Sequence, residues 1–316
     1  MAVRLIVGCG YVGSQVASKW LLNGDSVFAI TRSNDRAAHL RQLGIQPIVW
    51  DWLNGPLPIL AETLHSLGQH INAFATILIA VSHASQPDIP YAETHTRGLY
   101  NLDRLLKSES WEQTVGNETK WIYLSTTGVF GAATPGDWVN EESKVAPERP
   151  GSIAAWAGEQ WIASHIPSDQ RISLRPVGIY GPGRVPRWQS IRDQVPLQVD
   201  PESYLNLIHV EDLATSIVKV SNKRMESTLY CVSDGAPVRR RDYYEFIAKL
   251  GGWPPPVFEA ARPKELGEAS LRSDGNKRVR NHRLQTELGI EWEFPSYREG
   301  LTALLGERRD RTYDNS

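Results

Sequence analysis

Three glycines near the start of the chain have the spacing of a loop that holds phosphates. The segment VGCGYVG contains Gly8, Gly10 and Gly13 in a G-x-G-x-x-G pattern, between an apolar run and an expected helix. The first glycine makes a tight turn, the second lets the backbone approach a pyrophosphate, and the third lets helix and strand pack closely. We expect these glycines, with Tyr11 and Val12 between them, to bind a dinucleotide at the helix N-terminus. A tight turn without a ligand is the alternative.

The residues after the second apolar run indicate which dinucleotide is bound. An Asp or Glu about 20 positions after the glycines would bind a ribose 2′-hydroxyl and favour NAD, whereas this chain has Thr31 and Arg32 there. A guanidinium cannot accept a hydroxyl proton, but its planar donor group can pair with a 2′-phosphate. The sequence therefore favours NADP as the cofactor over NAD, unless Arg32 is simply a solvated loop residue.

Two further strand ends are expected to contact the same ligand. Asp51 could accept a hydrogen bond from an adenine amino group and Trp52 could lie beside the ring, although Asp51 could equally cap a helix. Ala80, Val81 and Ser82 end the fourth apolar run and should meet the dinucleotide at the carboxyl edge of a parallel sheet. No metal-ligand spacing is visible, so we expect no metal site.

Such a constellation needs a parallel sheet to bring the strand ends together. In the first half of the chain, short β-branched runs alternate with amphipathic segments, which is typical of βαβ units. The expected strands are residues 3–8, 26–32, 46–52, 74–81, 120–126 and 171–177. The expected helices are residues 13–22, 36–43, 58–67, 90–108 and 152–165. Because such strands need helices on both faces, we predict an α/β fold: a Rossmann-type doubly wound parallel sheet with a smaller C-terminal substrate lobe.

The pattern of the chain changes after residue 177, where Gly and Pro become frequent in GIYGPGRVPRW. We predict an NAD(P)-binding domain over residues 1–177, to which residues 205–222 return. The substrate lobe then consists of residues 178–204 and 223–305. The polar residues 306–316 are predicted to form a flexible tail.

Composition excludes several other classes of protein. With 316 residues of which 41% are hydrophobic, the chain can bury a substantial core, which argues against disorder. A formal net charge of -2 provides no basic field, so we expect neither a nucleic acid nor a membrane as partner. The chain has only Cys9 and Cys231, and its longest apolar run, residues 73–81, is too short to span a bilayer. We therefore predict a cytoplasmic protein.

Four segments together resemble the extended short-chain dehydrogenase/reductase superfamily, which contains nucleotide-sugar epimerases and dehydratases. Besides VGCGYVG, they are LSTTGVFG (124–131), LRPVGIYGPGR (174–184) and NLIHVEDLA (206–214). The likeness covers nearly the whole chain and implies an NAD(P)-binding oxidoreductase or epimerase-like protein. It also implies that Pro176 and Ile179, in the third segment, lie beside the cofactor.

The same resemblance implies an active site made of an Asn, a Ser or Thr, and a Tyr-x-x-x-Lys pair. In the family, the Lys lowers the pKa of the Tyr so that the phenol exchanges a proton while hydride passes to or from nicotinamide. Aligned on Glu159, the segment GSIAAWAGEQ places Gly151 at the Tyr position and Ala155 at the Lys position. The hydroxyl survives as Thr126. Chains with such losses are identified as atypical members of the superfamily.

His95 stands where the family has its Asn, and an imidazole titrates near neutral pH. Thr126 and His95 are therefore the candidate catalytic residues, although a helix histidine more often makes a structural hydrogen bond. One hypothesis is an enzyme with a reorganised acid–base site. The other is a catalytically inactive NAD(P)-loaded scaffold or redox sensor that acts through a protein partner, and cell-division regulation is a role to which some epimerase-like relatives are linked. The expected partners are an unidentified substrate, for which an anionic compound is one candidate, and either a second copy of the chain or a regulatory protein.

Overall fold

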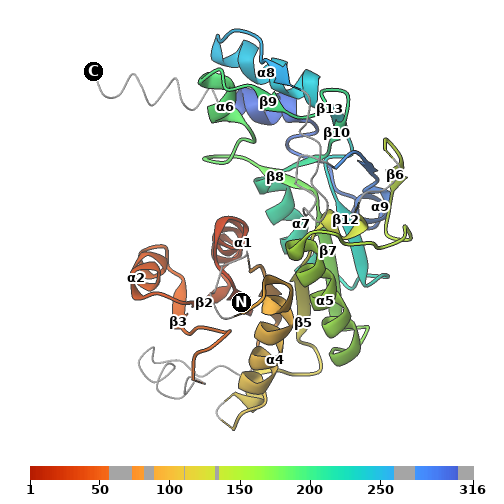
Figure 1. Ribbon diagram of the computed structural model, residues 1–316. Helices are drawn as coiled ribbons and strands as arrows, with labels where there is room; N and C mark the ends of the chain where they lie inside the picture. Colours follow the sequence, from red (N-terminus) through yellow and green to blue (C-terminus); the bar gives the residue numbers. More distant parts are fainter. Residues whose placement is uncertain (57–72, 82–88, 110, 132–134, 260–274, 305–316) are drawn as a thin grey trace. The chain divides into compact units, whose positions relative to one another are not determined.

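The computed structural model describes residues 1–56, 73–81, 89–109, 111–131, 135–259 and 275–304, which divide into two compact units (Figure 1). The first unit consists of Met1–Ser125, Pro150–Leu174 and Ala214–Tyr230. The second consists of Thr126–Arg149, Arg175–Leu213 and Cys231–Ser316. The helix expected at 58–67, Ser82 and the tail 306–316 lie outside the described residues.

A seven-stranded sheet forms the centre of the first unit. Its order is β12-β7-β5-β4-β1-β2-β3, and the registers from β7 to β3 are all parallel. The strands are β1 (Val3–Val7), β2 (Ser26–Thr31), β3 (Gln46–Val49), β4 (Thr76–Ile79), β5 (Lys120–Leu124), β7 (Arg171–Pro176) and β12 (Leu229–Val232). The strand order reverses at β1, which lies between β4 and β2. Ligands of such sheets bind at that reversal, beyond the carboxyl ends of the strands.

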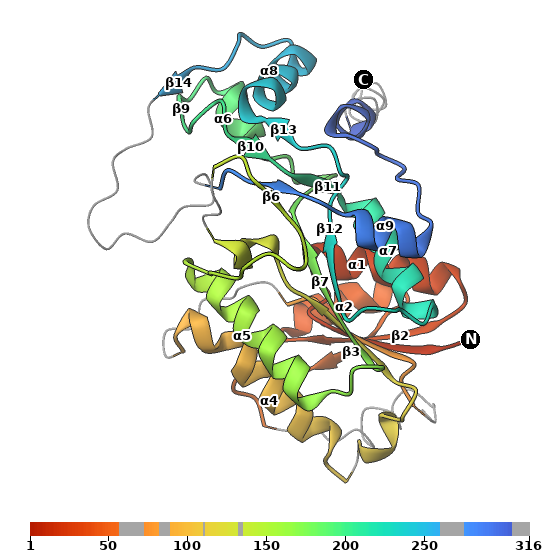
Figure 2. The ribbon, with the colours of Figure 1, turned by 90° about the vertical axis from the view of Figure 1, so that its right-hand side faces the viewer.

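Helices cover both faces of this sheet (Figure 2). On one face, α4 (Thr94–Leu106) and α5 (Pro150–His165) lie side by side and bury residues such as Leu99 and Ile162 against the strands. The other face carries α1 (Tyr11–Leu22), α2 (Asn34–Gln42) and the end of α7 (Val210–Asn222). There the indole N–H of Trp20 donates to the Ser221 hydroxyl at 3.2 Å. The predicted Rossmann-type doubly wound α/β fold is confirmed.

The third strand is shorter than the sequence predicted. It ends at Val49 instead of residue 52 because the chain turns directly afterwards. The Gly55 N–H donates to the Asp51 carbonyl at 2.7 Å, and the Asp51 carboxylate accepts the Leu53 N–H at 3.1 Å. The helix expected at 90–108 is likewise divided into a 3-10 turn, η1 (Tyr91–Glu93), and α4. A second such turn, η2 (Glu112–Thr114), precedes β5.

The second unit is built from short elements around an aromatic core that includes Tyr180, Tyr243 and Tyr297. Three strand pairs are parallel: β8 (Gly178–Tyr180) with β11 (Leu207–His209), β9 (Leu197–Gln198) with β14 (Phe258–Glu259), and β6 (Trp138–Val139) with β15 (Arg278–Val279). One pair, β10 (Tyr204–Leu205) with β13 (Val238–Arg239), is antiparallel. The helices are η3 (Thr127–Phe130), α6 (Trp188–Arg192), α8 (Arg240–Gly251), α9 (His282–Leu288) and a helical stretch at 297–304. The domain boundary at residue 177 stays a prediction.

Candidate functional site

The loop that follows β1 is shaped by its glycines. Gly8 has a φ of +88°, and a Cβ there would lie 2.8 Å from the Cα of Val81, so the position requires glycine. A Cβ at Gly13 would lie 2.8 Å from the carbonyl oxygen of Gly8, so a side chain would force α1 away from the loop. Gly10 differs, because a Cβ there would meet nothing within 4 Å. As the N-cap of α1, Gly10 leaves its backbone open to a ligand, which is the cradle that a pyrophosphate needs.

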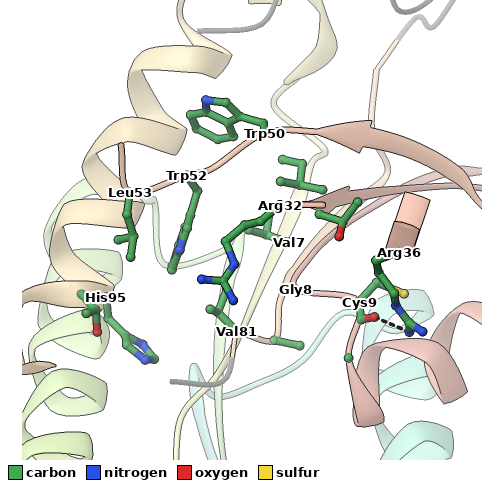
Figure 3. Close-up of a pocket in the computed structure, with 15 residues that line it drawn as sticks. Val7, Gly8, Cys9, Arg32, Arg36, Trp50, Trp52, Leu53, Val81 and His95 are labelled. Atoms are coloured by element: carbon green, nitrogen blue, oxygen red, sulfur yellow. Dashed lines mark hydrogen bonds between the residues drawn. The ribbon is translucent and has the colours of Figure 1, made fainter. Parts of the chain in front are cut away.

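A cavity of about 220 Å³ opens at the carboxyl ends of the strands, beside this loop (Figure 3). The residues that line it lie at the carboxyl ends of β1 and β2, in the segments that follow β1, β2, β3 and β4, and in the first turns of α2 and α4, and all belong to the first unit. The sequence-predicted residues among them are Gly8, Gly10, Thr31, Arg32, Trp52, Ala80, Val81 and His95. The cavity therefore lies at the reversal of strand order, where the fold places a ligand.

Other predicted residues are not among those that line the cavity. Within the first unit, these are Tyr11, Val12, Gly13 and Asp51. The Asp51 carboxylate accepts a hydrogen bond within the turn after β3, as described above. Three predicted residues belong to the second unit: Thr126, Pro176 and Ile179. Ser82 lies outside the described residues.

Thr126 is the N-cap of η3. Its Oγ1 accepts the backbone N–H of Gly128 at 3.0 Å. Because that bond uses a lone pair of the oxygen, the hydroxyl proton can still be donated to a substrate oxygen. The next residue, Thr127, donates its own hydroxyl to the carbonyl of Pro176 at 3.3 Å. This geometry is compatible with the predicted role of Thr126, which stays a prediction.

Two arginines place positive charge on the lining of the cavity. Arg32 follows β2, and Arg36 lies in the first turn of α2, where its N–H donates to the hydroxyl of the N-cap Ser33 at 3.3 Å. The Arg36 guanidinium donates to the Cys9 carbonyl at 2.8 Å and to the Ser14 hydroxyl at 2.9 Å, so it ties the glycine loop to α2 (Figure 3). Arg36 was not predicted from the sequence as a site residue. The signal in the sequence was Ser33, which can cap a helix, followed three residues later by a second arginine.

A buried phenol holds the imidazole of His95. The His95 Nδ1 lies 2.6 Å from the Oη of Tyr123, and Tyr123 also donates to the carbonyl oxygen of Ala155 at 3.2 Å. Burial raises the pKa of Tyr123 well above its usual value, and the nearby Glu159 and Tyr91 raise it further. The phenol therefore keeps its proton at neutral pH. Tyr123 was not proposed from the sequence.

The helix α5 carries Gly151 and Ala155 at the positions that the sequence predicts to correspond to the family's Tyr and Lys. A Cβ at Gly151 would lie 2.7 Å from the Oη of Tyr91. At Gly158, two turns further along the helix, a Cβ would overlap the Oη of Tyr123. The hydroxyl ends of Tyr91 and Tyr123 thus occupy the space along this face of α5 that side chains at 151 and 158 would need.

Within the described part of the chain, no group of three or more His, Cys, Asp or Glu side chains is placed to hold a metal ion. None of the helices in that part has the length and apolar character that crossing a bilayer requires.

Comparison with known proteins agrees with this geometry. The sequence profile described as the NAD dependent epimerase/dehydratase family matches residues 5–230. Protein YeeZ of Escherichia coli K12 is 24% identical over 290 residues, which cover 92% of this chain and 95% of that protein. A protein of Stigmatella aurantiaca, named 4-hydroxy-2-methyl-3-oxo-4-farnesyl-3,4-dihydroquinoline-1-oxide ketoreductase, is 24% identical over 280 residues, 84% of this chain and 79% of its own length.

A solved structure shows the same fold. The UDP-glucose 4-epimerase of Thermotoga maritima superposes with a TM-score of 0.74 at 18% identity. The superposition covers 98% of this chain and 99% of that one.

Proposed function

Because the chain belongs to the NAD dependent epimerase/dehydratase family, as an atypical extended short-chain dehydrogenase/reductase, we propose that it is an NADP(H)-dependent oxidoreductase of a carbonyl or hydroxyl group. The observation that carries the proposal is one cavity with the open backbone of Gly10, two arginines and His95 on its lining. When bound, the nicotinamide supplies or takes up a hydride. The protein then has to bind and orient the two reactants and to hold or move one proton.

The preference for NADP rests on the charge of the cavity. Arg32 and Arg36 both line it, and none of the described lining residues is an Asp or Glu. A ribose 2′-hydroxyl would therefore find no carboxylate acceptor there, whereas a 2′-phosphate would find two guanidinium groups. Because Arg36 is already anchored to Cys9 and Ser14, little side-chain freedom is lost when it binds the phosphate.

We assign to His95 the transfer of the proton that accompanies the hydride. Its imidazole lines the cavity, and histidine is the side chain that most often serves as a general acid or base. The hydroxyl of Thr126 is proposed to orient the substrate oxygen, as the family resemblance implies. Reduction of a ketone is also what the name of the Stigmatella aurantiaca relative describes, which supports the reaction class without identifying the substrate.

One observation favours a second candidate function. Position 151 has no side chain, and the phenol of Tyr91 occupies the adjoining space. The family's own proton donor therefore has no room there without a shift of Tyr91. An NAD(P)-loaded scaffold, acting through a protein partner, would need no proton donor at all.

Isotope transfer distinguishes the two functions. The protein is incubated with NADPH deuterated at the nicotinamide C4 and with a panel of ketones and sugar nucleotides, and deuterium in each product is measured by mass spectrometry. We expect transfer to at least one carbonyl compound. Saturable binding of NADPH without transfer to any member of the panel would support the scaffold, and no binding would contradict both functions.

The coenzyme preference is tested in the same assay. Replacing Arg36 with Ala should raise KM for NADPH by about tenfold or more, since a charge-assisted hydrogen bond contributes about 1.5–3 kcal/mol, and should leave KM for NADH nearly unchanged. Arg104→Ala, an exposed arginine on α4, is the matched control. Equal losses with both coenzymes would show that Arg36 acts on the glycine loop and not on a 2′-phosphate.

A further inference from the structure

The side chains around His95 determine both the position of its ring and which ring nitrogen carries the proton. The His95 ring lies edge-on to the Tyr123 ring, with centroids 6.0 Å apart and an interplanar angle of 84°. On another side, the ring of Trp52 lies edge-on to it at 6.5 Å, and Trp52 itself packs over Gly98. Tyr123 is fully buried and is not among the residues that line the cavity, whereas His95 is. The imidazole that lines the cavity is thus packed edge-on against two aromatic rings.

Counting protons assigns the tautomer of His95. The phenol of Tyr123 has one proton, and the carbonyl of Ala155, 3.2 Å away, can only accept. If the phenol proton pointed away from Ala155, a lone pair of the Tyr123 Oη would face a lone pair of the Ala155 carbonyl oxygen in a buried site, which is unfavourable. With the proton on the Ala155 side, Tyr123 offers His95 a lone pair. The Nδ1 of His95, 2.6 Å away, must then be the donor.

We propose that Tyr123 is a positioning residue that fixes His95 as the Nδ1–H tautomer, so that Nε2 is the nitrogen that exchanges the proton of the reaction. The proposal rests on the proposed oxidoreductase function and deepens it. Two consecutive hydrogen bonds link the Ala155 carbonyl to Tyr123 and Tyr123 to His95. They take over the task of the missing Tyr and Lys with a different set of groups.

The proton balance of the step follows from this order. In reduction, the protonated His95 gives its Nε2 proton to the carbonyl oxygen while the carbon receives hydride from a reduced nicotinamide. The electron pair of the broken N–H bond stays on Nε2, and His95 becomes neutral with Nδ1–H still donated to Tyr123. In oxidation, the Nε2 lone pair takes the hydroxyl proton. Tyr123 never ionises, which agrees with the strong upward shift of its pKa by burial.

The glycine at 158 makes room for this arrangement. Any side chain there would overlap the Oη of Tyr123. Among the described residues, Glu159 on α5 and Tyr91 in η1 are close enough to Tyr123 to act on its pKa, and Arg32 and Arg36 line the cavity.

Nitrogen-15 NMR of the full chain tests the tautomer without turnover. In protein labelled at its histidine nitrogens, two-bond proton–nitrogen couplings identify which ring nitrogen of His95 carries the proton. We expect Nδ1–H in the wild type above the pKa of His95. Nε2–H in the wild type would overturn the proposal, and this result needs no variant to fold.

Tyr123→Phe tests the role of the phenol. Without its acceptor, His95 should lose the preference for Nδ1–H, and the pKa of its imidazolium should fall. Turnover should drop about tenfold or more, a part of what a positioned acid–base group contributes, with KM for NADPH unchanged. An unchanged tautomer and pH profile in this variant would overturn the proposal. Tyr100→Phe, at a tyrosine with 57% exposure on α4, is the matched control.

The oxidoreductase function and the positioning role of Tyr123 can be refuted independently of each other. If no substrate is turned over but the tautomer responds to Tyr123→Phe as expected, the hydrogen-bond chain stands and the oxidoreductase function fails. If turnover is found and the tautomer is insensitive to Tyr123, the function stands and the positioning role fails.

Discussion

Replacing Gly10 with Ala should separate coenzyme binding from folding. A Cβ at this position meets no atom within 4 Å, so the fold has space for an added methyl group. Because Gly10 is the N-cap of α1 and Ala is a poorer N-cap than Gly, the free energy of unfolding should fall by about 1 kcal/mol. The added methyl group lies at the N-terminus of α1, where we place the pyrophosphate.

The effect on binding should be much larger. A hydrogen bond from a backbone N–H to a charged phosphate contributes about 1.5–3 kcal/mol, and each 1.4 kcal/mol is a factor of about ten in affinity. If the methyl group breaks one such bond, Kd for NADPH rises by about 10- to 100-fold.

Thermal unfolding without coenzyme and fluorescence titration with NADPH measure the two effects separately. Gly116→Ala is the control, because a Cβ there would make an ordinary contact at 3.9 Å with Ala73, and Gly116 is not a lining residue. The control should match the wild type in both assays. A folded Gly10→Ala protein with wild-type affinity for NADPH would refute the placement of the phosphates at this loop.

Three further substitutions have distinct expected results. Gly8→Ala should lower the free energy of unfolding in urea by at least about 1–2 kcal/mol, because φ is +88° and backbone atoms of Val81 and Ala80 block a Cβ; wild-type stability would contradict this. Gly158→Ala should lower Tm, and Tyr123→Phe should relieve part of that loss, because it removes the Oη that a Cβ would overlap while the ring Cζ stays 2.6 Å from that Cβ; additive losses in the double variant would disprove the overlap. Burial raises the pKa of Asp234 to about 8, so the folded chain keeps a proton that the unfolded chain releases above its ordinary pKa of about 4. Stability should therefore fall as pH rises from about 4 to about 8, and denaturation of Asp234→Asn across that window should show a smaller decline.

The coenzyme half of the site could be predicted because its signals are local. The glycine spacing, the apolar runs and the residues directly after them each lie in one short segment. The rule that parallel strands share a carboxyl edge then brings Thr31, Trp52 and Val81 to one cavity. Asp51 shows the limit of that rule, because a tight turn after β3 engages its carboxylate in a hydrogen bond to Leu53.

The proton-transfer half could not be predicted in the same way. Tyr123 has the sequence context of an ordinary buried strand residue, and its hydroxyl gains meaning only from the helices packed over it. His95 and Ala155 meet that hydroxyl from two helices far apart in sequence. The register between α4 and α5 is set by tertiary packing, which no single segment specifies. Arg36 is an intermediate case, since its helix cap was visible but its reach to Cys9 was not.

Calorimetric titration of the purified protein with NADPH and with NADH tests the central claim most directly. We predict saturable binding of NADPH at a single site, with affinity for NADH lower by about tenfold or more, as expected when contacts to a charged 2′-phosphate are lost. Failure of both coenzymes to bind, to a protein shown to be folded, would contradict the account of this site.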